Sequence, residues 1–215
     1  MYSYQLENCR CTFTFDEPAE KLCRSIFATK YLSGANMTSD YKKLSFHASH
    51  AEPLLSFVNR QSNKSSSFTY HRAILLIKYI GSQLFQLEKQ NASLLWMDIE
   101  HIFVINKQFM FYFGNEHVAD IDQETKKINF CILEHMSNHP FAAPEFKMIK
   151  TIPATVPHQA PYYSLGAITT YCLFGDIDPQ NISPDIFGPI VDTKLYWFLL
   201  RAIEINPNKR NYLFV

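Results

Sequence analysis

Four residues near the N-terminus, Cys9, Cys11, His47 and His50, are of the types that bind zinc. Two thiolates and two imidazoles would suit a tetrahedral zinc site. The long stretch between the two pairs favours the alternative, a pair of strand cysteines and a loop with two solvated histidines. We therefore expect no metal. The chain also contains no Gly-x-Ser-x-Gly motif for a serine nucleophile.

Three short motifs in the second half of the chain form a second pattern. Ala143-Pro144-Glu145 is followed by Ser164-Leu165-Gly166, which opens an apolar helical stretch, and then by Asn206-Pro207-Asn208-Lys209-Arg210. This order resembles the lower lobe of a eukaryotic protein kinase and covers residues 50–215. In that family the Glu of the first motif forms a buried ion pair with the Arg of the last. The resemblance thus implies a structural ion pair between Glu145 and Arg210.

The positions that would carry phosphoryl transfer in a kinase hold unsuitable side chains. Transfer requires carboxylates at the substrate hydroxyl and at the metal. An ungapped alignment places Trp96 at the catalytic base and His101 at the metal-binding amide. Tyr112-Phe113-Gly114 matches the family's later Asp-Phe-Gly motif, so Tyr112 stands at the second metal position. An indole has no proton-accepting group, and a neutral phenol is a poor ligand for Mg²⁺. A rival register with Asp98 as the base needs a two-residue deletion inside the loop.

The nucleotide-binding parts of a kinase are missing from the sequence as well. Before Gly81 the only glycine is Gly34, so no Gly-x-Gly-x-x-Gly loop can form. The residues before the hinge-like Glu52-Pro53-Leu54-Leu55 are too few for a complete upper lobe. We therefore expect a protein that is not an enzyme, has no catalytic residues and binds no cofactor.

Composition restricts the classes of partner. Twenty basic and twenty acidic residues balance in a chain of 215 residues, so no net charge attracts nucleic acid or an anionic membrane. We expect neither as a partner. Five cysteines without the spacing of a disulfide framework favour a reducing compartment, the cytosol or nucleus.

The hydrophobic pattern and the resemblance together lead us to expect a mainly α fold of the α+β class. We expect an N-terminal extension, 1–50, with a short strand and an amphipathic helix, and a kinase lower-lobe-like domain, 51–215. The central element is a long buried helix between Phe68 and Lys89. Other expected elements are a strand at 11–15, a helix at 17–32, strands at 102–105 and 109–113 around an Asn106-Lys107 turn, and helices at 163–174 and 195–203.

An apolar set in the N-terminal extension has two interpretations. It consists of Phe13, Phe15, Leu22, Ile26 and Phe27. These side chains could pack on the chain's own lower lobe, or they could dock on another protein. A missing upper lobe would leave the top of the lower lobe exposed, and exposed apolar patches mark interaction sites. We therefore expect these five residues to bind a partner.

A more specific resemblance suggests the identity of that partner. Leu54 to Arg60, the long helix and Ile102-Phe103 resemble the lower lobe of kinases that phosphorylate eukaryotic initiation factor 2 on its alpha subunit. The truncated layout resembles the baculovirus kinase-like inhibitors of these kinases. The resemblance implies a viral decoy in the host cytoplasm. It would bind a host eukaryotic initiation factor 2-alpha kinase through that kinase's N-terminal lobe (N-lobe) and prevent translational shutoff. The alternatives are a pseudokinase scaffold, a nucleotide-binding sensor and a minimal active Ser/Thr kinase that uses Asp98.

Overall fold

The computed structural model describes residues 1–62, 68–131, 139–175, 178–179 and 181–210. Of these residues 41% are helical and 23% lie in strands, most of them in small antiparallel sheets. The expectation of a mainly α fold is therefore wrong, and the protein is α+β. The difference arises largely in the first 50 residues, which form a four-stranded sheet rather than an extension with one short strand.

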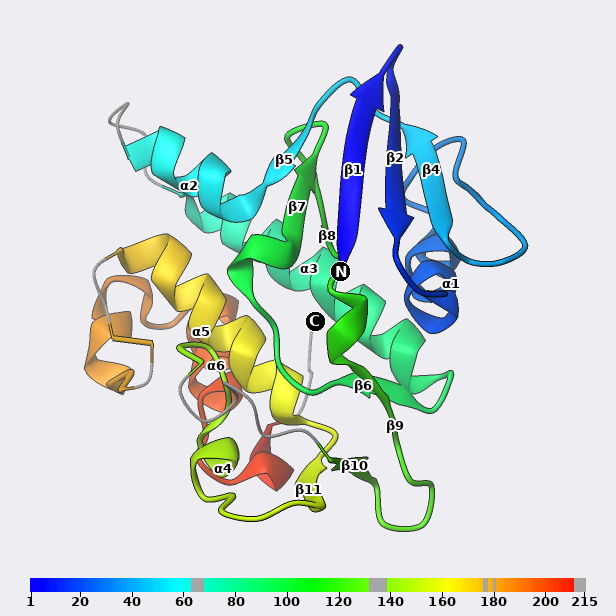
Figure 1. Ribbon diagram of the computed structural model, residues 1–215. Helices are drawn as coiled ribbons and strands as arrows, with labels where there is room; N and C mark the ends of the chain where they lie inside the picture. Colours follow the sequence, from blue (N-terminus) through cyan, green and yellow to red (C-terminus); the bar gives the residue numbers. More distant parts are fainter. Residues whose placement is uncertain (63–67, 132–138, 176–177, 180, 211–215) are drawn as a thin grey trace.

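The N-terminal sheet is antiparallel, with the strand order β1-β2-β4-β3, and helix α1 packs beside it (Figure 1). The bounds are β1 Tyr2–Glu7, β2 Arg10–Phe15, α1 Glu20–Thr29, β3 Asn36–Met37 and β4 Lys43–His47. Asn8 and Cys9 join β1 to β2 with positive φ angles of 49° and 59°. A two-residue type I′ turn needs two such residues, and its twist matches that of the strands.

The predicted alternation in β2 is confirmed. Cys11, Phe13 and Phe15 are buried, whereas Thr12 and Thr14 between them are only partly covered. Together with Leu22 and Ile26 of α1, these side chains belong to the upper cluster, a hydrophobic core that also includes buried residues between 32 and 51 and Phe103, Ile105, Phe111 and Phe113.

A second sheet lies between the upper cluster and the rest of the protein. Its strand order is β5-β7-β8, with β5 at Ala51–Pro53, β7 at Ile102–Ile105 and β8 at Phe109–Tyr112. The predicted hairpin turn is confirmed, because Asn106 and Lys107 have φ angles of 51° and 60° and β7 pairs directly with β8.

Both faces of the β7–β8 hairpin are buried, which explains why nearly every residue in it is apolar. One face, formed by Ile102, Val104, Met110 and Tyr112, packs into the larger core. The other face packs into the upper cluster and consists of Phe103, Ile105 and Phe111, with Phe113 just after β8. The hairpin thus joins the two cores.

The remaining elements build the larger core around α3, which runs through the middle of the molecule (Figure 1). In chain order they are α2 Leu54–Ser62, α3 Tyr70–Glu88, β6 Ala92–Leu94, η1 Ile99–His101, η2 Asn115–His117, β9 Val118–Asp120, β10 Lys127–Phe130, α4 Pro144–Lys147, β11 Ala154–Pro157, α5 Ala160–Phe174, η3 Pro184–Ile190, α6 Lys194–Ala202 and η4 Pro207–Lys209. β6 pairs with β9 and β10 pairs with β11.

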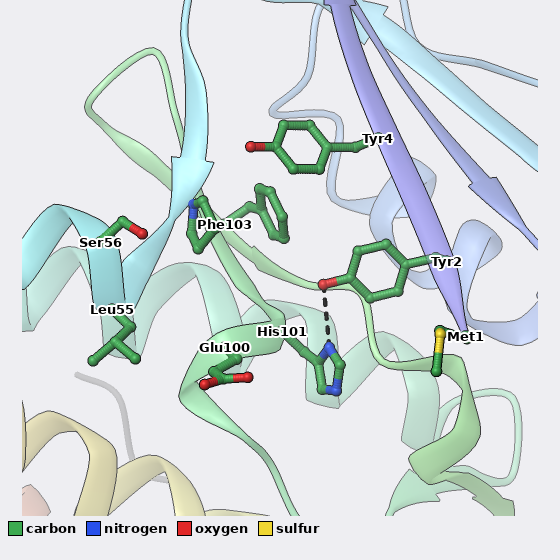
Figure 2. A pocket seen from close by; sticks show the side chains of 9 residues that line it. Met1, Tyr2, Tyr4, Leu55, Ser56, Glu100, His101 and Phe103 are labelled. Carbon is green, nitrogen blue, oxygen red and sulfur yellow. Dashed lines mark hydrogen bonds between the residues drawn. The ribbon is translucent and has the colours of Figure 1, made fainter.

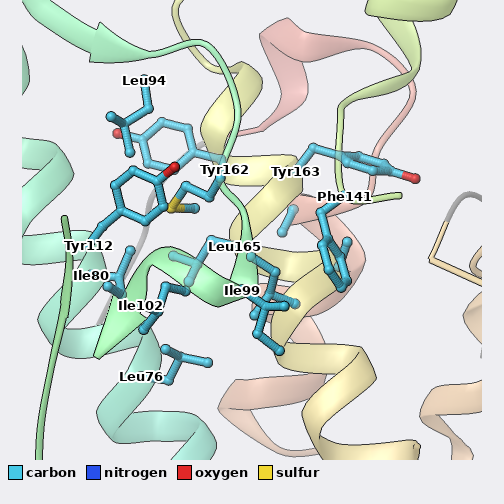
Figure 3. Close-up of a cluster of buried hydrophobic side chains, with 14 of the residues drawn as sticks. Leu76, Ile80, Leu94, Ile99, Ile102, Tyr112, Phe141, Tyr162, Tyr163 and Leu165 are labelled. Carbon is cyan, nitrogen blue, oxygen red and sulfur yellow. The ribbon is translucent and has the colours of Figure 1, made fainter. Parts of the chain in front are cut away.

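Helix α3 confirms the predicted long buried helix and also fixes the hairpin. The Thr69 side chain caps it by accepting from the Arg72 N–H. Gln83, buried on its inner face, accepts from the Tyr112 N–H and donates to the Tyr112 carbonyl, both at 2.8 Å. The same core encloses the Tyr112 ring (Figure 3). The two hydrogen bonds of the Gln83 amide fix the position of the end of β8 relative to α3.

Helices α5 and α6 pack unusually close together at one point. A methyl group built on Gly166 would lie 2.6 Å from the Cβ atom of Ala202. Real Cβ atoms do not approach so closely, so only glycine fits at this crossing. The expected helix at 163–174 is present as α5, which begins earlier, at Ala160, and lies almost entirely within the core.

Candidate functional site

The structure brings Glu145 and Arg210 together. Arg210 Nη1 donates to Glu145 Oε1 at 2.7 Å, and Nη2 donates to Oε2 at 2.9 Å. Arg210 is almost fully buried. Its Nε and Nη2 groups also donate to the carbonyls of Glu204 and Ile205, and its guanidinium lies over the Tyr163 ring. This buried, bidentate pair links the turn η4 to helix α4.

Tyr112, His117 and Trp96 form a contiguous aromatic group below the hairpin. Tyr112 is completely buried, its hydroxyl meets Nδ1 of His117, and burial raises the pKa of this phenol. The Trp96 ring packs on the His117 ring with centroids 4.3 Å apart. Trp96 Nε1 has no hydrogen-bond partner among the described residues. Neither Trp96 nor Tyr112 presents a carboxylate or a free base here.

His101 lies between this group and the N-terminal strand. Its Nδ1 is 3.1 Å from the Tyr2 hydroxyl (Figure 2). Its Nε2 is 3.3 Å from Glu116 Oε1. One ring nitrogen of His101, one of His117 and a carboxylate oxygen of Glu116 all lie within 4.8 Å of one another. The sequence interpretation missed this cluster, because Glu116 and His117 belong to no motif that it considered.

Asp98, the alternative base, is engaged in local interactions. Its carboxylate accepts from the Glu100 N–H at 3.0 Å, which caps η1, and lies 3.0 Å from Nε2 of His139. Burial raises the pKa of Asp98, but the hydrogen bonds from His139 and Glu100 outweigh it and hold the pKa below its usual value. Asp98 therefore remains an ionised, paired carboxylate at neutral pH.

The four zinc-ligand candidates do not form a cluster among the described residues. Cys11 pairs with Phe46 in the β2–β4 register, and both side chains point into the upper cluster. His47, the next residue after Phe46, points to the opposite face because strand side chains alternate. His50 instead lies 2.6 Å from Glu52.

The docking role expected of the apolar set requires correction. Phe13, Phe15, Leu22 and Ile26 are at most 2% exposed, because they form the upper cluster beneath the N-terminal sheet. Only Phe27 of that set is exposed, at 46%. The premise of an uncovered lower lobe was also wrong, since the N-terminal sheet covers the upper face of the β7–β8 hairpin.

Aromatic rings fill the space directly above the hairpin. Phe13 stacks on Phe113 with ring centroids 3.7 Å apart and an interplanar angle of 5°. The Phe103 ring makes edge-to-face contacts with the Phe13 ring, at a centroid distance of 4.9 Å, and with the Tyr4 ring, at 4.7 Å. These contacts hold the N-terminal sheet against the hairpin.

A pocket of about 400 Å³ opens beside these rings, between β1 and the start of α2 (Figure 2). Its lining consists of Met1, Tyr2, Tyr4, Pro53, Leu55, Ser56, Glu100, His101 and Phe103. The pocket therefore reaches from the exposed edge of β1 to His101 of the imidazole–carboxylate cluster.

Within the described ranges no helix has both the length and the apolar character needed to cross a membrane. No protein-family model matches the sequence. No curated protein matches it either.

Proposed function

We propose that this protein is a catalytically inactive kinase-lobe mimic. It binds a host eukaryotic initiation factor 2-alpha kinase through the kinase N-lobe, in the host cytoplasm, and inhibits phosphorylation of the factor. The proposal starts from the motif resemblance, and the geometry of the candidate site supports it at three points.

The first support carries the proposal: the chain has the buried ion pair that the kinase resemblance implies, but it lacks the side chains that phosphoryl transfer requires. The buried pair between Glu145 and Arg210 is the contact that the kinase resemblance implies. The positions aligned with the catalytic carboxylate and the metal ligands hold Trp96, His101 and Tyr112. A scaffold that lacks the acids needed for phosphoryl transfer can still bind a kinase.

The second support is steric. A nucleotide held between two kinase lobes would lie above the β7–β8 hairpin. Here that space contains the stacked rings of Phe13 and Phe113 and the edge of Phe103. Nucleotide binding would require these buried rings to separate, which would cost about 1.5–3 kcal/mol for each large apolar side chain exposed. This argues against the sensor and active-kinase alternatives.

The third support concerns the docking surface, which we assign to β1 and the pocket beside it. β1 is an edge strand of its sheet, so it offers unpaired backbone groups to a partner strand. Tyr4, 39% exposed, lies at the pocket, and Leu6, 37% exposed, follows it on the same strand face. Docking here leaves the upper cluster intact.

The test is a reconstituted assay in which a host initiation factor 2-alpha kinase phosphorylates the factor in the presence of this protein. The variant Tyr4→Glu should need at least about tenfold more protein for half-inhibition, because buried tyrosine anchors are common interface hot spots. The matched control is Trp197→Glu on α6, where the ring is 53% exposed. Helix α6 packs against α5, and Figure 1 shows both helices apart from β1. It should inhibit like the original chain.

Failure of the unaltered protein to bind the kinase or lower factor phosphorylation would overturn the proposal. Equal inhibition by the Tyr4 and Trp197 variants would overturn the assignment to β1. A separate check uses γ-labelled ATP: phosphate transfer by the purified chain that Asp98→Asn abolishes would establish the active-kinase alternative instead.

A further inference from the structure

We propose that His101, Glu116 and His117 form a binding site for a divalent transition-metal ion, with Zn²⁺ the best match. One potential ligand atom from each residue lies within 4.8 Å of the other two. The proposal is independent of the proposed kinase inhibition.

The hairpin register explains why these three residues meet. Ile102, the first residue of β7, pairs with Tyr112, the last residue of β8. The residue before β7 and those after β8 must therefore lie side by side, and the Phe113 N–H donates to the His101 carbonyl at 2.9 Å. The single turn of η2, Asn115–His117, then directs Glu116 and His117 toward His101.

The donor set determines the class of metal. Two imidazole nitrogens and one carboxylate oxygen are a ligand set of three-ligand zinc sites, in which a water or substrate takes the fourth position. Mg²⁺ and Ca²⁺ prefer sites made only of oxygen ligands, so two histidines disfavour them. Ligand–metal distances of about 2 Å would require the three atoms to move together slightly. Glu116, whose side chain is 37% exposed, can make most of that movement.

Two tyrosines orient the histidines as metal ligands require. The Tyr2 hydroxyl contacts Nδ1 of His101, and the Tyr112 hydroxyl contacts Nδ1 of His117. In metal sites the second ring nitrogen of a histidine usually has such a partner, which fixes the tautomer and the ring plane. The nitrogen left for the metal in each ring is then Nε2.

The surroundings provide both rigidity and access. Trp96 packs on the His117 ring and keeps it buried. The partly exposed Glu116 side chain opens the cluster to solvent, so an ion and its fourth ligand can reach it. His101 also lines the pocket next to β1 (Figure 2). Because Tyr2 belongs to β1, a bound ion would connect the N-terminal sheet to the hairpin.

The test is metal binding to the full chain after treatment with a chelator. Zn²⁺ would be titrated in competition with a chromophoric chelator, and Co²⁺ would be added separately as a spectroscopic probe. We expect one ion per chain and the intense visible absorption of four-coordinate Co²⁺. Glu116→Gln and His101→Gln should each weaken Zn²⁺ binding at least about tenfold, since even outer-shell changes cost 10–100-fold.

Three control variants keep the result interpretable. Glu100→Gln changes a neighbouring acid that is absent from the cluster, and His71→Gln removes an exposed histidine on α3. Cys9→Ser removes an exposed thiol that could bind zinc nonspecifically. All three should bind like the unaltered chain. Absence of stoichiometric binding, or binding that the Glu116 and His101 variants leave unchanged, would show that the cluster is only a hydrogen-bonded ion pair.

Discussion

The pair between Glu145 and Arg210 makes the sharpest prediction about stability. Glu145→Gln keeps the size of the side chain but leaves the Arg210 guanidinium, which is 1% exposed, without its counter-charge. Stranding one member of a buried ion pair costs roughly 3–5 kcal/mol. The two carbonyls that Arg210 also binds cannot replace the lost charge. We therefore expect Glu145→Gln to lower the free energy of unfolding by about that amount.

Urea denaturation followed by circular dichroism measures this loss. The matched control is Glu20→Gln, which breaks an exposed i,i+4 pair with Arg24. Such pairs contribute only about 0.2–0.5 kcal/mol. The double variant Glu145→Leu with Arg210→Met should unfold with a smaller loss than Glu145→Gln, because no charge remains buried. A loss for Glu145→Gln as small as that for Glu20→Gln would refute the reasoning.

Three further predictions concern packing and protonation. Phe13→Asp should lower the free energy of unfolding by at least about 3 kcal/mol, because it removes a buried ring and places a charge in the upper cluster. The control Phe27→Asp, at an exposed site, should change the free energy of unfolding by no more than about 0.5 kcal/mol. Thermal unfolding measures both. Gly166→Ala should cost roughly 1–3 kcal/mol through its collision with Ala202, and adding Ala202→Gly should restore part of that loss in the same urea assay. Burial lowers the pKa of His117 from 6.5 to about 4. At a pH between these two values, His117 is therefore protonated in the unfolded chain but neutral in the folded chain. In chelator-treated protein the free energy of unfolding should therefore fall as pH drops from 6.5 to 4, and His117→Gln should remove about one proton from that dependence.

The central hairpin and helix could be predicted because their signals are local. Asn106 and Lys107 both adopt positive φ angles within the three-residue loop between β7 and β8, and apolar strands flank that loop on both sides. Helix α3 has a threonine cap and a long apolar pattern. Neither feature depends on knowing which distant segment packs against it.

The N-terminal sheet was underestimated for a physical reason. β1, Tyr2–Glu7, is an edge strand with mostly exposed side chains, so it lacks the strong alternation that marked β2. Its order comes from pairing with β2 and from Tyr2 and Tyr4 packing on Phe103. Such contacts between distant segments cannot be read from hydrophobic periodicity.

The same limit explains the error about docking and the missed cluster. An apolar set such as Phe13 and Leu22 has the same sequence pattern whether it faces a partner or its own core. Only the pairing of β2 with β4 and the packing of α1 decide the matter. Likewise, His101 and Glu116 are fifteen residues apart, and only the register of β7 with β8 brings them together.

The residues that the kinase resemblance aligns with catalytic positions have interactions of their own. Trp96 packs on His117, the Tyr112 hydroxyl meets that imidazole, and His101 connects the group to Tyr2 of the N-terminal strand. Folded proteins leave few buried polar atoms without a partner, and among these side chains Trp96 Nε1 is the one that lacks a partner in the described part of the chain. Here the aromatic and imidazole side chains fill the site and link the two cores. A carboxylate substituted for Trp96 or Tyr112 would therefore disrupt these contacts.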